Sequence, residues 1–238
     1  MQGLHEDRFW LREDLSIADE LTALAPKLRE EFLNYHSDFI DGEFSKGKFF
    51  DHKIYNLNEI LNKQYAWKTD FLKYSLEPHE KNGVSETIKD DYYLIDEVRN
   101  RYPTAVALTE KYAKDCPISS YSILEPDTII KRHTDIENRD AKFIRIHIPL
   151  IVPEGECFFE CEGYEIDWSD IWAFNNQRAH SAYNLTDRRR LVYIFNISRS
   201  ILGIEDSKYS FDFEVESATP PFVRGALPKV YHTVQLSK

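Results

Sequence analysis

The second half of the chain is a series of short β-branched or aromatic segments, separated by turn-forming groups such as Glu-Asn-Arg-Asp and Pro-Glu-Gly-Glu. Short strands at this spacing are typical of a sandwich or a barrel, because each strand can bury one face only against a second sheet. The fold class is therefore expected to be mainly β. The expected strands cover residues 119–130, 143–152, 157–167, 170–175 and 190–198.

Helices are expected before these strands. Apolar residues recur at helical spacing in residues 16–35 and again in 94–114, where Pro103 interrupts the pattern. Residues 45–92 between them are polar, aromatic and irregular, and no Gly/Ser linker or internal repeat marks a boundary. We therefore expect one domain over residues 1–238. Its expected parts are a helical and irregular N-terminal part (1–118), a β core (119–200) and a C-terminal extension (201–238).

Composition excludes several classes of partner. The formal net charge is -11, so phosphate backbones and anionic lipid surfaces should be repelled, and neither a nucleic-acid nor a membrane partner is expected. The N-terminus has no basic segment followed by an apolar run, which predicts a cytoplasmic protein. Three cysteines suit a reducing compartment, and Cys157 and Cys161 are expected to be packed thiols rather than a metal or redox pair.

One expected strand has two different faces, because successive strand side chains point to opposite sides of a sheet. The first face holds Ile144, Ile146 and Ile148, and the second holds Arg145 and His147. If the isoleucines pack under the helices, the two polar side chains point into the barrel, where a charge usually serves a ligand. The alternative is an edge strand whose polar face is solvated.

Two histidines and one aspartate have the pattern of a metal site. His133-Thr-Asp135 follows a strand-like run, and His180 comes after further strands. Two imidazoles and a carboxylate on one side of a metal leave three positions open, as in non-haem Fe(II) oxygenases. The H-x-D pattern alone is weak, and a purely structural role for these residues remains the alternative.

Arg190 supports the metal-site hypothesis. A strand from His180, a tight turn at residues 184–187 and a returning strand would bring Arg190 back toward His180. A buried guanidinium suits bidentate capture of a carboxylate, such as that of a dicarboxylate cosubstrate. Arg188 and Arg189 are instead expected to be solvated turn residues.

A set of motifs over residues 121–198 resembles one known family in order and spacing. The motifs are Tyr121-Ser-Ile-Leu-Glu-Pro-Asp-Thr-Ile-Ile-Lys-Arg-His133, Arg145-Ile-His147, Val152-Pro-Glu, Cys157-Phe-Phe-Glu-Cys161, Trp168, Phe174-Asn-Asn, His180 and Arg190-Leu-Val-Tyr-Ile-Phe. They are similar to those of the aspartyl/asparaginyl β-hydroxylases. The resemblance implies a double-stranded β-helix of jelly-roll or cupin type with flanking N-terminal helices. It also implies an oxygenase that uses Fe(II), 2-oxoglutarate and O2.

The resemblance also implies roles for particular residues, with no catalytic residue beyond the metal centre. It implies His133 and His180 as iron ligands, Arg190 for the distal carboxylate of 2-oxoglutarate, Ser122 and His147 as further contacts of that cosubstrate, and Arg145 for a substrate carboxylate.

Asp135 departs from the animal members of the family, which have glycine at this position. Bacterial hydroxylases of free amino acids with similar sequences, including proline hydroxylases, keep the H-x-D. Asp135 therefore favours a full ligand triad and argues against halogenation, because a halide needs the position that the carboxylate fills. Trp172, Asn176 and Arg178 either line the substrate pocket or serve packing, and Trp168 is expected in the core or at the barrel rim.

The expected activity is hydroxylation of a free amino acid or a small amino-acid derivative, with succinate and CO2 as co-products. One alternative is hydroxylation of Asp, Asn or another residue in a peptide or carrier-bound substrate. A second is a non-catalytic cupin barrel that binds a small ligand. A third is zinc-dependent hydrolysis, which would give Arg190 no role.

Overall fold

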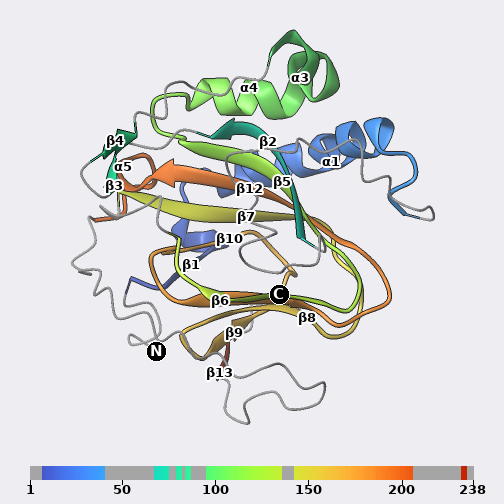
Figure 1. The fold of residues 1–238 in the computed structure, drawn as a ribbon. Coiled ribbons are helices and arrows are strands. Elements are labelled where there is room, and N and C mark those ends of the chain that lie inside the picture. Colours follow the sequence, from blue (N-terminus) through green and yellow to red (C-terminus); the bar gives the residue numbers. More distant parts are fainter. Residues whose placement is uncertain are drawn as a thin grey trace.

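Two mainly antiparallel sheets face each other, and helices cover the outer side of the larger one (Figure 1). The computed structural model describes residues 7–40, 67–74, 79–81, 84–86, 95–135, 142–205 and 232–234. The larger sheet has the strand order β1-β10-β7-β12-β5-β2, and the smaller has β13-β9-β8-β11-β6. The strands are β1 (Phe9–Leu11), β2 (Trp67–Tyr74), β3 (His79–Lys81), β4 (Val84–Glu86), β5 (Ile118–Leu124), β6 (Thr128–His133), β7 (Phe143–Ile151), β8 (Cys157–Cys161), β9 (Tyr164–Ile166), β10 (Trp172–Phe174), β11 (His180–Asn184), β12 (Arg190–Ser198) and β13 (His232–Val234).

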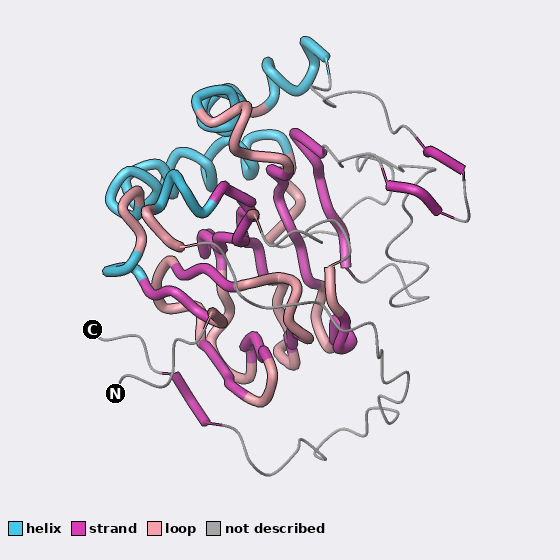
Figure 2. Tube along the Cα trace, turned by 90° about the vertical axis from the view of Figure 1, so that its left-hand side faces the viewer, coloured by secondary structure: helices cyan, strands magenta, loops and turns pink. Residues whose placement is uncertain are grey.

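Strands β5 to β12 wind back and forth between the two sheets. Strands β5, β7, β10 and β12 belong to the larger sheet, and β6, β8, β9 and β11 belong to the smaller. This is the winding of a double-stranded β-helix, and it confirms the expected mainly β, cupin-like fold with N-terminal helices. Figure 2 shows the helices gathered on one side of the strands. They are α1 (Ala18–Tyr35), α3 (Ile95–Arg101) and α4 (Pro103–Lys111), with η1 (Arg12–Asp14) and α5 (Arg199–Leu202) as short additional turns.

The two faces of β7 lie as predicted. Ile144, Ile146 and Ile148 are fully buried in one core cluster with Leu21, Leu28 and Phe32 of α1. The opposite face of the larger sheet turns toward the smaller sheet, across a second cluster rich in aromatic rings. The edge-strand alternative is wrong, because β7 lies inside the larger sheet between β10 and β12.

Two expected strands are each divided by a turn. Residues 119–130 contain nearly all of β5 and the first half of β6, which lie in different sheets. Pro126 and Asp127 turn the chain between them, and Asp127 has a positive φ of 50°. Residues 157–167 form the hairpin β8–β9 instead of one strand. Its two turn residues, Glu162 and Gly163, have φ values of 50° and 84°, and positive φ at both positions is typical of a type I′ turn.

The helix predictions agree with the structure. The expected helix at 16–35 is α1, and the one at 94–114 is α3 followed by α4, with Pro103 at the first position of α4, where its missing N–H costs nothing. All three cysteines are buried free thiols. Most of residues 45–92 and 201–238 lie outside the described residues. Among the helices that the structure describes, none has the length and apolar character needed to cross a membrane.

Truncating a side chain between α1 and the larger sheet should destabilise the protein strongly. Phe32 is fully buried, and its ring lies 5.1 Å from the rings of both Phe39 and Tyr121. Phe32→Ala is expected to lower the free energy of unfolding by about 3–5 kcal/mol in urea denaturation, because it leaves a cavity. Ile40→Ala is the control, since Ile40 is 59% exposed and should change stability by about 0.5 kcal/mol at most. Equal effects of the two substitutions would contradict this assignment of the core.

Candidate metal centre and anion pocket

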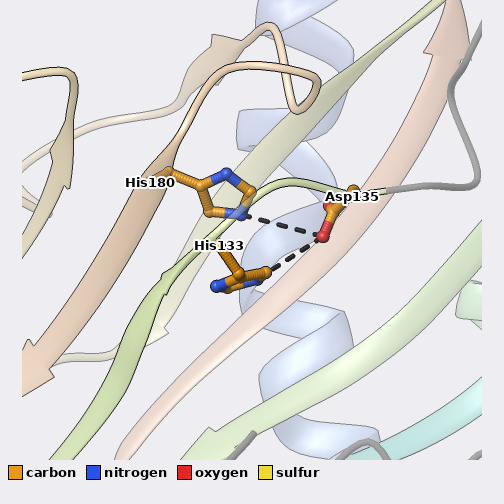
Figure 3. Close-up of side chains that lie close together, drawn as sticks. All are labelled: His133, Asp135 and His180. Atoms are coloured by element: carbon orange, nitrogen blue, oxygen red, sulfur yellow. Dashed lines mark ion pairs between the residues drawn. The ribbon is translucent and has the colours of Figure 1, made fainter. Parts of the chain in front are cut away.

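The pairing of β6 with β11 brings the three predicted metal ligands together. His180, the first residue of β11, lies directly opposite His133, the last residue of β6. The chain leaves β6 after His133, so Asp135 returns its carboxylate toward both rings (Figure 3). Asp135 Oδ1 lies 3.5 Å from His133 Nε2 and 3.8 Å from His180 Nε2. One ligand atom from each residue lies within 4.8 Å of the others, which fits a single metal ion with two nitrogen ligands and one oxygen ligand.

Two neighbours hold the carboxylate of Asp135 by its other oxygen. Arg145 Nη1 lies 2.5 Å from Oδ2, and the side-chain amide of Asn176 donates to Oδ2 at 3.1 Å. The backbone N–H of Asp135 also donates to the Asn176 carbonyl at 2.9 Å. Burial by itself would raise the pKa of Asp135, but the positive charge of the Arg145 guanidinium, together with the adjacent imidazoles of His180 and His133, outweighs this effect and holds that pKa well below its usual range. The carboxylate is therefore ionised, and Oδ1 faces the histidines.

His180 is also oriented and neutral. Its Nδ1 lies 2.8 Å from the backbone carbonyl of Arg178, which orients Nε2 as the ligand atom. Burial, followed by the neighbouring His133, lowers the pKa of His180 to about 3. At neutral pH the ring is thus the uncharged imidazole that binds metals.

Arg190 and His147 are two buried polar side chains close to the metal ligands. The Arg190 side chain is 2% exposed, and its Nε and Nη1 atoms have no hydrogen-bond partner among the described residues. Burial lowers the pKa of Arg190 to about 10, so it stays cationic at neutral pH. Burial lowers the pKa of His147 well below its ordinary value, with further contributions from Arg145 and Arg190, and its buried Nδ1 likewise has no described partner. The chemistry of this pair suits a carboxylate, because a buried guanidinium whose Nε and Nη1 have no described partner needs an anion.

Ser122 shares the face of the larger sheet that carries these side chains. On β5 and β12 the alternate residues Tyr121, Ile123, Leu191 and Tyr193 pack on the helix side, so Ser122 and Arg190 turn toward the smaller sheet. The hydroxyl of Ser122 accepts a hydrogen bond from Trp67 Nε1 at 3.0 Å. Its predicted contact with a cosubstrate stays a prediction.

The hairpin expected between His180 and Arg190 is wrong. Strand β11 pairs with β6 and β8, whereas β12 pairs with β5 and β7, so the intervening turn crosses from one sheet to the other. The side chains of His180 and Arg190 nevertheless both lie close enough to His147 to contribute to the lowering of its pKa. Arg188 is exposed, as expected. Arg189 is half-buried instead, and its Nε lies 2.7 Å from Glu125 Oε2.

The turn after β10 supplies positioning contacts that the sequence patterns did not reveal. Asn176 holds Asp135, and the Arg178 carbonyl holds His180, so one short turn orients two of the three predicted ligands. Asp7 fixes the turn in its place, because its backbone carbonyl accepts from Arg178 Nε at 2.7 Å. The contacts of Asn176 with Asp135 and of Arg178 with Asp7 join residues far apart in the sequence, and no spacing rule marks them.

Among comparisons with known proteins, the match to a family model agrees with this site. The family model described as Aspartyl/Asparaginyl beta-hydroxylase matches residues 16–200. Among solved structures, a Pseudomonas putida prolyl-4-hydroxylase is similar at 11% identity and a TM-score of 0.39, over 82% of this chain and 94% of that one. A 2OG-Fe(II) oxygenase-family oxidoreductase from Burkholderia pseudomallei is similar at 12% identity and a TM-score of 0.36, over 57% of this chain and 69% of that one. No curated protein matches the chain.

Removing the side chain of Asn176 should weaken metal binding without unfolding the protein. Asn176→Ala deletes the amide that holds Asp135 Oδ2, so we expect about 10- to 100-fold weaker affinity in an anaerobic Fe(II) or Co(II) titration. Asn34→Ala, at an exposed position on α1, is the matched control and should bind metal like the wild type. Unchanged affinity in Asn176→Ala would show that the turn does not position the ligand.

The metal-free protein should lose stability on acidification. The pKa of His147 and that of His180 both lie below the unfolded value of about 6.5, so the unfolded chain binds more protons as the pH falls below that value. The stabilisation is complete above pH ~6.5 and is lost as the pH falls, by about 2 kcal/mol from pH 7 to pH 5 for His180. Urea unfolding at pH 7, 6 and 5 measures this loss, and His147→Gln should remove the part that belongs to His147. Equal stability at pH 5 and pH 7 would refute the neutral, buried state of both rings.

Proposed function

The chain belongs to the aspartyl/asparaginyl β-hydroxylase family and is a 2-oxoglutarate-dependent dioxygenase with an iron site, and from this premise we propose that its substrate is a free amino acid or a small amino-acid derivative. Bound Fe(II), with 2-oxoglutarate and O2, supplies the oxidation that converts a C–H bond to C–OH and releases succinate and CO2. The protein contributes the positions of the ligands, the cosubstrate and the substrate.

The proposed roles follow the position of each side chain. His133, Asp135 and His180 hold the iron, and their neighbours keep the carboxylate ionised and His180 neutral. Arg190 takes the distal carboxylate of 2-oxoglutarate, since its buried Nε and Nη1 have no described partner. Ser122 and His147 are proposed as further contacts of this cosubstrate, on the same face of the larger sheet.

The observation that carries the substrate proposal is the guanidinium of Arg145 beside the metal ligands. Arg145 is 8% exposed, and its Nε donates to Asn196 Oδ1 at 2.8 Å, which fixes the plane of the group. A rigid buried arginine recognises a carboxylate with a defined orientation. A free amino acid always offers an α-carboxylate, whereas an internal peptide residue offers none unless it is Asp or Glu. The three free cysteines additionally support a reducing compartment such as the cytoplasm as the place of action.

The test is succinate formation from 2-oxoglutarate after anaerobic loading with Fe(II) and addition of O2. Free amino acids are screened against the same amino acids as α-amides and within short peptides, with His133→Ala as the inactive control. We expect a free amino acid to stimulate succinate formation and its α-amide to lose about 100-fold in kcat/KM, because a neutral amide cannot accept the charge-assisted hydrogen bonds that Arg145 would donate to a carboxylate. Arg145→Gln should reduce this discrimination.

The outcomes separate the alternatives. Stimulation of succinate formation by peptides but not by any free amino acid would show that the substrate is a residue within a peptide. Bound iron without turnover of any substrate would support a ligand-binding barrel instead of an enzyme. Hydrolysis of a substrate by the zinc-loaded protein, undiminished in Arg190→Ala, would indicate hydrolytic chemistry.

A further inference from the structure

Trp168 lies between the two groups proposed to bind the cosubstrate. It belongs to the segment between β9 and β10, and it is 5% exposed. The Arg190 guanidinium carbon lies 4.6 Å from the centre of its ring, and the His147 ring centroid lies 5.3 Å from it. One indole thus contacts both Arg190 and His147.

The indole N–H of Trp168 has no partner in the described part of the chain. Nε1 is buried and makes no hydrogen bond, like the adjoining Arg190 Nε and Nη1. A buried N–H without an acceptor is unfavourable, and native proteins rarely keep one. Trp67 illustrates the usual state, since its buried Nε1 donates to Ser122. Several unpaired donors in one place therefore point to an acceptor-rich ligand.

A second indole–arginine pair shows what the first one lacks. The Arg199 guanidinium carbon lies 5.0 Å from the ring of Trp10, and Arg199 Nη1 pairs with the Asp7 carboxylate at 2.6 Å. Arg145, the other buried arginine among the described residues, also pairs with a carboxylate. Arg190 stacks on an indole in the same way, but without a carboxylate from the described chain.

We propose that Trp168 is a cosubstrate-binding residue, whose ring face orients the Arg190 guanidinium and whose indole N–H donates to the distal carboxylate of 2-oxoglutarate. The inference rests on the proposed function and adds a binding residue to it. Trp172 also has an unpaired buried Nε1, and its ring contacts His147, but the contact with Arg190 belongs to Trp168.

The test is equilibrium binding of 2-oxoglutarate to the Zn(II)-loaded full chain, which does not turn over. Trp168→Phe keeps an aromatic ring near Arg190 but removes the N–H together with part of the indole, so we expect about tenfold weaker binding. Binding of 2-oxopentanoate, which has the same carbon chain without the distal carboxylate, should be unchanged. Trp10→Phe, at the matched indole–arginine pair, should bind both ligands like the wild type.

The indole N–H can also be observed directly in the wild-type protein. The chain has four tryptophans, so an ¹⁵N spectrum contains four indole signals, which Phe substitutions at the other three positions assign by elimination. The Trp168 proton is expected to shift downfield when 2-oxoglutarate binds, and that of Trp10 is expected to stay in place. This measurement decides the question if Trp168→Phe does not fold.

Two binding results would overturn the proposal for Trp168. One is unchanged 2-oxoglutarate affinity in a folded Trp168→Phe, and the other is an equal loss for 2-oxoglutarate and 2-oxopentanoate, which indicates a merely structural ring. An unshifted Trp168 indole signal with bound 2-oxoglutarate has the same meaning. If the wild-type protein binds no 2-oxoglutarate at all, the proposed function itself fails, and the two failures are thereby distinguished.

Discussion

A single strand, β7, separates the two environments of this protein. Its isoleucines pack beneath α1, and this burial fixes the side on which Arg145 and His147 must lie. A shift of one residue in register would place two polar groups under the helices and three isoleucines in the site. The apolar helix layer therefore determines where the charges are, and its packing energy offsets the cost of burying them.

Among the described residues of the site, the Asp135 carboxylate has partners in Arg145 and Asn176, whereas the Arg190 guanidinium pairs with no carboxylate. Asp135 receives Arg145 and Asn176 on one oxygen, which leaves the other oxygen for a metal shared with the histidines. The ligands are thus fixed by neighbours that are themselves fixed, as Arg145 is by Asn196. Such support reduces the reorganisation needed when a ligand binds.

Local patterns in the sequence predicted what depends on strand alternation and little of what depends on long-range pairing. The faces of β7 follow from periodicity, whereas the candidate ligands His133, Asp135 and His180 were suggested by residue type and supported by the family resemblance. The division of 119–130 between two sheets does not, because a strand pattern does not say which sheet receives the next strand. The sequence did not decide whether Asn176 lines the substrate pocket or serves packing. The reason is the same, because its partner Asp135 is 41 positions away in the chain.

The balance of charge in the site explains why an acidic chain can bind acidic ligands. The surface carries the excess of carboxylates that gives the net charge of -11, whereas the interior holds Arg145 and Arg190 against Asp135. A divalent metal adds further positive charge, and in a low-dielectric interior such an excess is costly until anions enter. The two negative charges of a dicarboxylate neutralise most of this excess positive charge, and the carboxylate of an amino acid pairs with the positive charge that remains. The same imbalance makes molecules without a carboxylate poor ligands for this interior, so the charges of the site and its metal favour carboxylates.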